Sequence, residues 1–322
     1  MAAGRTNNFL LSITRIVIFF VCAFLPCSLN AQEVSVSNWW DDNAIIATGT
    51  GYAPSKAKNP YHARMLAYRA AITDGYRNLA EKVGEIHITA ESTIESQILS
   101  GDIVETKVDA VIRGATVLSE EFSEDGGCHV VLSVPIFGVT DSLAKVALKP
   151  VDKEEFPRPS ENFVANENTE GNYTGLIIDC GDVDLNPVLL PVIRNADNLS
   201  IYGYNNLEYD KAVTGGVVGY VTRDTAQAAT MLLSRGNALP MSYTALIERK
   251  LLLLTSQSSE NNISRAGNNP LIIKAESMSD GNSCPVVSIS DADKILAENQ
   301  ASHFLDNGAV VFTSYRVGGV RV

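Results

Sequence analysis

The sequence has few of the side chains that bind metals or attack substrates. It contains four histidines and five cysteines, and two of the cysteines lie within residues 1–31. The other three, Cys128, Cys180 and Cys284, are too far apart for a CxxC motif. No two histidines have the i,i+4 spacing of a zinc site on a helix. We therefore expect neither a metal site nor a thiol redox centre, and we expect the three cysteines to be buried.

Basic residues are also fewer than acidic ones. There are 25 Lys and Arg against 37 Asp and Glu, which gives a formal net charge of −12. Nucleic acids and anionic membrane surfaces attract basic proteins, and a chain this acidic lacks that electrostatic footprint. We expect no nucleic-acid partner.

Motifs that mark catalytic or nucleotide sites are incomplete. No Gly-x-Ser-x-Gly elbow is present. The carboxylates that begin at Asp179 fail the EF-hand pattern, because its sixth and twelfth positions hold Asp184 and Leu190. The glycines at 49–51 and 215–219 lack the third glycine or the Lys-Ser/Thr of a phosphate loop. We therefore assign no catalytic, cofactor-binding or metal-binding residue, and we expect a protein that is not an enzyme.

The N-terminus has the pattern of a secretory signal peptide over residues 1–31. Arg5 and Arg15 precede an apolar run at 16–25, and a small residue, Ala31, stands at the cleavage site. The run is about half the ~20 residues that a membrane span needs. We expect export to the periplasm and no transmembrane span in the mature chain. Lipidation of Cys27 is an open alternative, although Pro26 stands where a lipoprotein signal has a small residue.

Residues 149–173 separate two domains. The segment holds three prolines, six acidic residues and few apolar ones, so it is expected to be an extended linker. The first domain would then comprise 32–148 and the second 174–322.

The first domain has the order β-α-β-β-β. Glycine-containing residues 43–53 predict a strand, and residues 60–84 predict a helix whose apolar stripe recurs every three or four positions. Three more strands are expected at 86–94, 108–118 and 128–136, with a hairpin turn at 124–127 and a short helix at 141–148. This pattern indicates an open sheet with a helix on one face.

The second domain also mixes strands with helices. Strands or extended runs are expected at 174–180, 187–193, 270–275, 286–289 and 309–315, and helices at 225–235 and 291–300. Ser290 and Asp293 predict a capping box for the second of these helices. The fold class is therefore α+β, with two domains that each have a mixed or antiparallel sheet and helices packed on one face.

Two adjacent tryptophans, Trp39 and Trp40, follow the expected cleavage site. Tryptophan is enriched at interfaces, so these residues are candidates for an interaction site. The other interpretation, that both rings pack on their own domain, remains open.

The first domain resembles the Lpp-twenty outer-membrane lipoproteins and is similar to the N-terminal domain of flagellar assembly protein T. The residues that carry this resemblance lie at 47–54, at 63–71 (an A-R-x-x-A-x-R-A-A pattern), at 76–81 and at 113–117. Residues 269–275 and 290–296 look like the second half of longer members. The resemblance implies an exported, non-enzymatic envelope protein, and some relatives help to build rings around the flagellar motor.

Two hypotheses follow. The first is a structural protein of the cell envelope, associated with the outer membrane or the flagellar motor, which contacts copies of itself and other envelope or basal-body proteins. The second is a periplasmic module that binds a small molecule in a pocket between the two domains.

Overall fold

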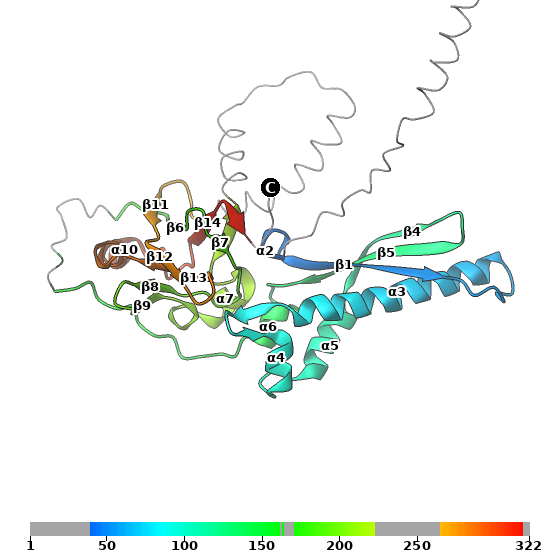
Figure 1. Ribbon diagram of the computed structural model, residues 1–322. Coiled ribbons are helices and arrows are strands. Elements are labelled where there is room, and N and C mark those ends of the chain that lie inside the picture. Colours follow the sequence, from blue (N-terminus) through cyan, green and yellow to red (C-terminus); the bar gives the residue numbers. More distant parts are fainter. Residues whose placement is uncertain (1–38, 162, 164–170, 223–264, 318–322) are drawn as a thin grey trace, which may run out of the picture. The chain divides into compact units, whose positions relative to one another are not determined.

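The computed structural model describes residues 39–161, 163, 171–222 and 265–317 (Figure 1). The expected signal peptide and the expected helix at 225–235 lie outside these residues. The described residues fall within one compact unit.

The first domain is a three-stranded antiparallel sheet covered on one face by a long helix. Its strands are β1 (Ala44–Tyr52), β4 (Thr116–Phe122) and β5 (Gly127–Pro135), in the order β1-β5-β4. The smaller elements are α2 (Trp39–Asp42), β2 (His87–Thr89), β3 (Ser92–Thr93), α4 (Ile94–Leu99), α5 (Glu105–Arg113) and α6 (Leu143–Ala147). The long helix, α3 (Pro60–Gly84), matches the expected helix at both ends. Its first turn is capped by Asn59, whose side chain accepts a hydrogen bond from the His62 N–H at 2.8 Å.

Two of the expected strands are wrong in part. Residues 105–113 form α5, and only the later residues 116–122 form a strand. Val108, Val111 and Ile112 are the buried residues of α5, and their i,i+3,i+4 spacing is that of a helix face rather than a strand. The expected strand at 86–94 is a short hairpin, β2–β3, followed by α4, whose first turn is capped by Thr93.

Glycine allows α3 to lie directly against β1. A Cβ on Gly49 would lie 2.2 Å from the Ala71 carbonyl oxygen and 2.3 Å from the Gly75 nitrogen. A Cβ on Gly51 would lie 2.3 Å from the Ala67 carbonyl oxygen. Backbone atoms cannot give way as a side chain can, so strand and helix touch only because these positions are glycine.

The second domain contains two four-stranded sheets. One is wholly parallel, in the order β10-β14-β6-β11, and the other is mixed, in the order β12-β13-β8-β9. Their strands are β6 (Gly175–Asp179), β8 (Ile193–Asn195), β9 (Ser200–Tyr202), β10 (Gly219–Thr222), β11 (Pro270–Lys274), β12 (Ser277–Ser279), β13 (Cys284–Val287) and β14 (Val310–Ser314). A two-stranded pair joins β7 (Asp184–Leu185) to β15 (Arg316–Val317), and the helices are a 3₁₀ turn (Tyr204–Asn206), α7 (Tyr209–Gly215) and α10 (Ile289–Ser302). The two-domain α+β fold class is confirmed.

The expected capping box at Ser290 and Asp293 is wrong. Helix α10 begins at Ile289, and its N-cap is Ser288, whose side chain accepts a hydrogen bond from the Asp291 N–H at 3.0 Å. Because the helix begins earlier than expected, Asp293 lies beyond the N-cap and does not cap the helix. Its carboxylate instead accepts a hydrogen bond from the Ser160 N–H at 2.8 Å.

The contact between α3 and β1 predicts a steep cost for one added methyl group. Gly49→Ala should lower the free energy of unfolding by about 3 kcal/mol, because the new Cβ would overlap backbone atoms of α3. The matched control is Gly84→Ala in the last turn of the same helix, where the nearest atom to a new Cβ lies 3.5 Å away. Urea unfolding of both variants checks this prediction, and equal stabilities would contradict it.

Candidate functional site

Trp39 and Trp40 pack against the chain's own cores. Both form part of α2 and are half-buried. Trp39 contacts the core clusters of both domains. Its ring lies edge-on to Trp40 at a centroid distance of 5.8 Å and edge-on to Tyr220 at 6.3 Å. The structure thus gives these residues a packing role, and their role in an interaction site stays a prediction.

A small cavity lies beside the tryptophans. It has a volume of about 240 Å³, and its lining includes Trp39, Trp40, Asp42 and Arg265. The Arg265 guanidinium donates hydrogen bonds to the carbonyl oxygens of Gly215 and Gly216, each at 2.6 Å. Burial lowers the pKa of Arg265, but an arginine stays charged in proteins, so these carbonyls hold a partly buried cation. Sites for small molecules usually span about 300–1,000 Å³, so this cavity is small for one.

The first part of the expected linker is bound along the second domain. Residues 149–161, which we call the strap, contain no helix or strand among the described residues. The strap is held by the Glu154 N–H, which donates to the Asn205 carbonyl oxygen at 2.7 Å, and by the bond from Ser160 to Asp293. The Phe156 ring stacks on Tyr202 with its plane tilted by only 3°.

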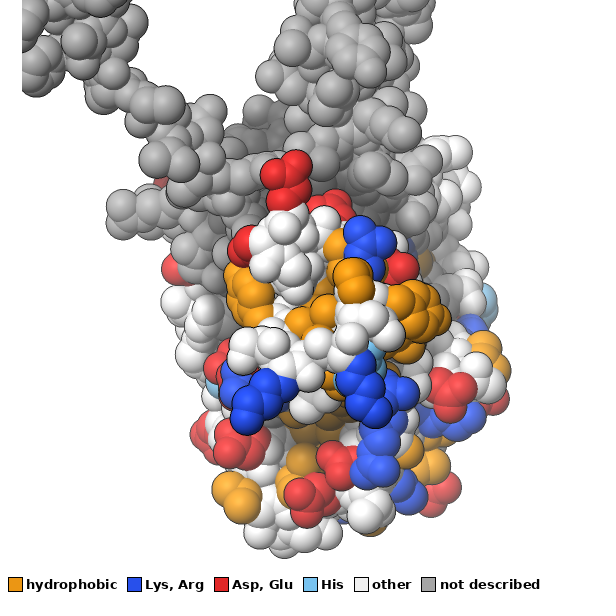
Figure 2. Space-filling model, turned by 90° about the vertical axis from the view of Figure 1, so that its right-hand side faces the viewer, with side chains coloured by type: hydrophobic (Ala, Val, Ile, Leu, Met, Phe, Trp, Pro, Cys, Tyr) orange, Lys and Arg blue, Asp and Glu red, His pale blue; other side chains and the backbone are white. Residues whose placement is uncertain are grey.

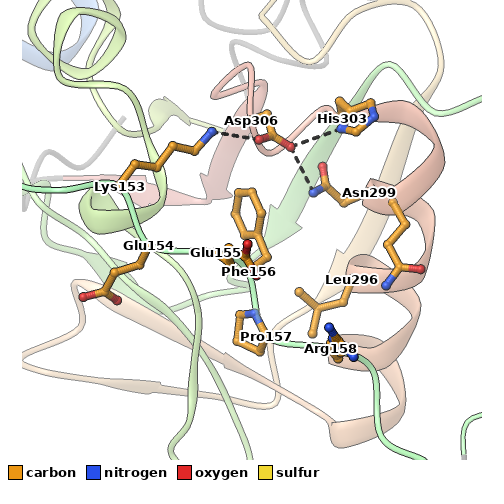
Figure 3. Close-up of a pocket in the computed structure, with 11 residues that line it drawn as sticks. Lys153, Glu154, Glu155, Phe156, Pro157, Arg158, Leu296, Asn299, His303 and Asp306 are labelled. Carbon is orange, nitrogen blue, oxygen red and sulfur yellow. Dashed lines mark hydrogen bonds and ion pairs between the residues drawn. The ribbon is translucent and has the colours of Figure 1, made fainter.

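A larger pocket opens between the strap and α10, with a volume of about 420 Å³ (Figure 3). Its charged centre is Asp306, which follows α10. Lys153 Nζ lies 3.0 Å from Asp306 Oδ1, and Asn299 Nδ2 and His303 Nδ1 each lie 3.4 Å from Asp306 Oδ2. The i,i+3 spacing of His303 and Asp306 was visible in the sequence, but nothing there indicated that Lys153 would reach them.

Opposing effects act on Asp306. Partial burial raises the pKa of its carboxyl group, but the hydrogen bond and charge of Lys153, with the hydrogen bonds of Asn299 and His303, outweigh burial. The pKa of Asp306 is therefore lowered, and the group is a carboxylate at neutral pH. The described lining of the pocket includes the carboxylates of Glu154, Glu155 and Asp306, the amine of Lys153 and the imidazole of His303. The pocket can hold a small polar molecule.

Cys128, Cys180 and Cys284 are buried, as expected. In the described ranges, no group of three or more His, Cys, Asp or Glu is arranged to hold a metal ion. The same ranges contain no helix that is both long and apolar enough to cross a membrane.

The two edges of the first-domain sheet differ. The free edge of β1 is covered by polar side chains of α3 spaced one helical turn apart. Asp74 Oδ2 accepts a hydrogen bond from the Thr50 N–H at 3.0 Å, Asn78 Nδ2 donates to the Thr48 carbonyl oxygen at 2.9 Å, and Lys82 Nζ donates to the Ile46 carbonyl oxygen at 2.7 Å. We call these three side chains the edge cap. The edge cap occupies backbone groups with which an added strand would pair.

The opposite edge, β4, is open. All seven of its residues are exposed, and Leu118 retains 56% of its accessible surface. Within the described part of the chain, β5 is the only strand hydrogen-bonded to β4. Arg64 of α3 reaches over the ring of Phe122, 5.4 Å from its centroid. A row of unpaired backbone groups with exposed apolar side chains is a template for an added strand.

Comparisons with known families support the division into two domains. Residues 41–135 match the LPP20 lipoprotein family, and residues 175–314 match the second domain of Treponema pallidum Tp0624. The first match confirms the resemblance to the Lpp-twenty lipoproteins and supports an exported protein of the cell envelope. The similarity to flagellar assembly protein T stays a prediction. No curated protein matches the chain.

Trp39 should contribute to stability, because it packs on both cores. Trp39→Ala should lower the free energy of unfolding by about 2 kcal/mol, less than for a fully buried tryptophan. Tyr52→Ala, which removes an aromatic ring that is 60% exposed, is the control and should change stability less. Thermal unfolding checks both, and an unchanged melting temperature for Trp39→Ala would show that the ring contributes nothing to folding.

The bonds to Asp306 predict a pH-dependent contribution. Asp306→Asn should lower the free energy of unfolding by about 1–2 kcal/mol at pH 7, because it removes the charge that Lys153 faces. A carboxyl group whose pKa is lowered by folding stabilises the protein above its usual pKa of 3.8, and this stabilisation is lost as the pH falls through the lower folded value. The free energies of unfolding of wild type and Asp306→Asn, measured by urea titration, should therefore approach each other below about pH 4. A difference in the free energy of unfolding that stayed constant with pH would contradict the argument.

Proposed function

We propose that this protein is a non-enzymatic protein of the cell envelope that assembles into, or docks onto, a ring structure associated with the outer membrane or the flagellar motor. It would reach the periplasm by means of a cleavable signal peptide over residues 1–31. Its partners would be copies of itself and other envelope or basal-body proteins.

The unequal edges of the first-domain sheet are the observation that carries this proposal. The edge cap of Asp74, Asn78 and Lys82 covers β1, whereas β4 exposes its backbone with Leu118 and Phe122. Soluble proteins normally blunt both edges of a sheet. A chain that covers one edge and exposes the other has a surface suited to binding a strand from a partner.

Two further findings support the proposal. The LPP20 lipoprotein match over residues 41–135 agrees with an envelope location. The non-enzymatic part rests on the sequence, in which no catalytic motif is complete. The competing hypothesis is a module that binds a small molecule. It is supported by the pocket between the strap and α10, although that pocket is lined by the strap and the second domain rather than by both domains.

The test is the mass of the mature chain, residues 32–322, by light scattering with negative-stain imaging of the same fractions. We expect closed oligomers, or a stable complex with an envelope protein, that Leu118→Lys weakens at least ~10-fold by placing a charge on the open edge. Leu199→Lys, at a similarly exposed leucine of the second domain, is the matched control. A monomer that binds no envelope protein would sink the proposal. Stabilisation of that monomer by a small molecule would favour the competing hypothesis.

A further inference from the structure

An apolar groove lies between the end of α3 and the two short helices α4 and α5. It has a volume of about 480 Å³. Its floor is made by buried residues of all three helices, which are Val83, Ile94, Val108 and Ile112. Leu99 lines the same groove and is 81% exposed, the most exposed large apolar side chain of the described residues. The groove therefore offers a partner both an apolar floor and one exposed apolar side chain.

The rim of the groove is acidic on both sides. Glu81 of α3 and Glu85, which directly follows α3, border one side, and Glu95, Glu105 and Asp109 border the other along α4 and α5. The described lining includes no lysine or arginine. Glu81 and Asp109 form ion pairs within their own helices, with Arg77 at 4.0 Å and with Arg113 at 3.3 Å. Among the described residues, Glu85, Glu95 and Glu105 have no ion pair, so they keep the rim negative. An apolar floor between carboxylates fits an apolar side chain flanked by cations.

The other end of α3 carries that arrangement. Tyr61 and Met65 stand one turn apart on an exposed face of the helix, and Tyr61 is 75% exposed. At 100° per residue, Arg64 and Arg69 fall on either side of this apolar pair. Figure 2 views the molecule from the side on which α3 begins and shows Lys and Arg side chains gathered near exposed hydrophobic ones.

These two surfaces cannot meet within one chain. They lie at opposite ends of α3, a helix of 25 residues that is about 37 Å long. We propose that they bind each other between copies of the chain: the start of α3, with Tyr61, Arg64, Met65 and Arg69, docks into the acidic groove of the next copy. This inference rests on the proposed function and names one contact of the assembly. The occupant of the groove is thus a second copy.

A contact of this kind is head-to-tail, because each copy uses two different surfaces. Such contacts close into rings when the rotation between neighbours allows it, and otherwise extend into filaments. The charges on both surfaces are exposed, so the contact should weaken as the salt concentration rises.

The test uses two variants of the mature chain whose substitutions are all at exposed positions. The start variant carries Tyr61→Ser and Arg69→Ser, and the groove variant carries Leu99→Ser and Glu95→Gln. Asp197→Asn with Leu199→Ser, at exposed positions of the second domain, is the matched control. Light scattering should show that each of the two test variants associates at least ~10-fold more weakly than wild type, and that the control does not.

Mixing the two variants provides the decisive measurement. The groove variant keeps an intact start and the start variant keeps an intact groove. An equal mixture can therefore form this contact once, between one chain of each kind, and should contain a mixed dimer that neither variant forms through this contact alone. The inference is overturned if the mature chain is monomeric, if the mixture forms no dimer, or if neither variant changes association. Assembly that survives in both variants but is lost in Leu118→Lys would refute this contact and leave the proposed function standing. If the mature chain is a monomer and its groove binds a cationic segment of another envelope protein, the contact between copies is refuted and the proposed function still stands.

Discussion

The close approach of β1 to α3 is the constraint on which the first domain depends. Gly49 and Gly51 let the helix backbone touch the strand, and the small residues Ala67, Ala71 and Gly75 of α3 complete the contact. This short separation also brings the polar side chains of α3 within hydrogen-bond distance of the β1 edge. If the helix stood one side chain further away, the edge cap could not form and the sheet would have two open edges.

The sequence predicted the elements whose signals are local. The ends of α3 were correct because Asn59, Pro60 and Gly84 mark them, and the β4–β5 hairpin was correct because Gly126 has a positive φ of 85° that glycine adopts readily. Helix α5 was missed although Val108, Val111 and Ile112 have helical spacing, because the β-branched residues at 108–112 continue into those of β4 and a short run of this kind is ambiguous between helix and strand. The parallel order of β10, β14, β6 and β11 joins segments far apart in the chain, which no local pattern encodes.

Less of the candidate sites could be predicted from the sequence. Proline and acidic residues correctly indicated that the strap has no regular structure, but not that Phe156 would stack on Tyr202. The acidic groove draws on α3, α4 and α5, so it exists only once those helices are packed together. The exposure of β4 could not be predicted, because an alternating pattern does not say how far a neighbouring helix extends across the sheet.

The edge cap has a consequence for behaviour at high concentration. A sheet with two open edges can add strands from one molecule to the next without limit, which is the route to cross-β fibres. With β1 closed, strand pairing through β4 can join only two such sheets, since each sheet has one edge to offer. The first domain can therefore expose an apolar strand to solvent, while runaway fibril growth by this route stops after a single pairing.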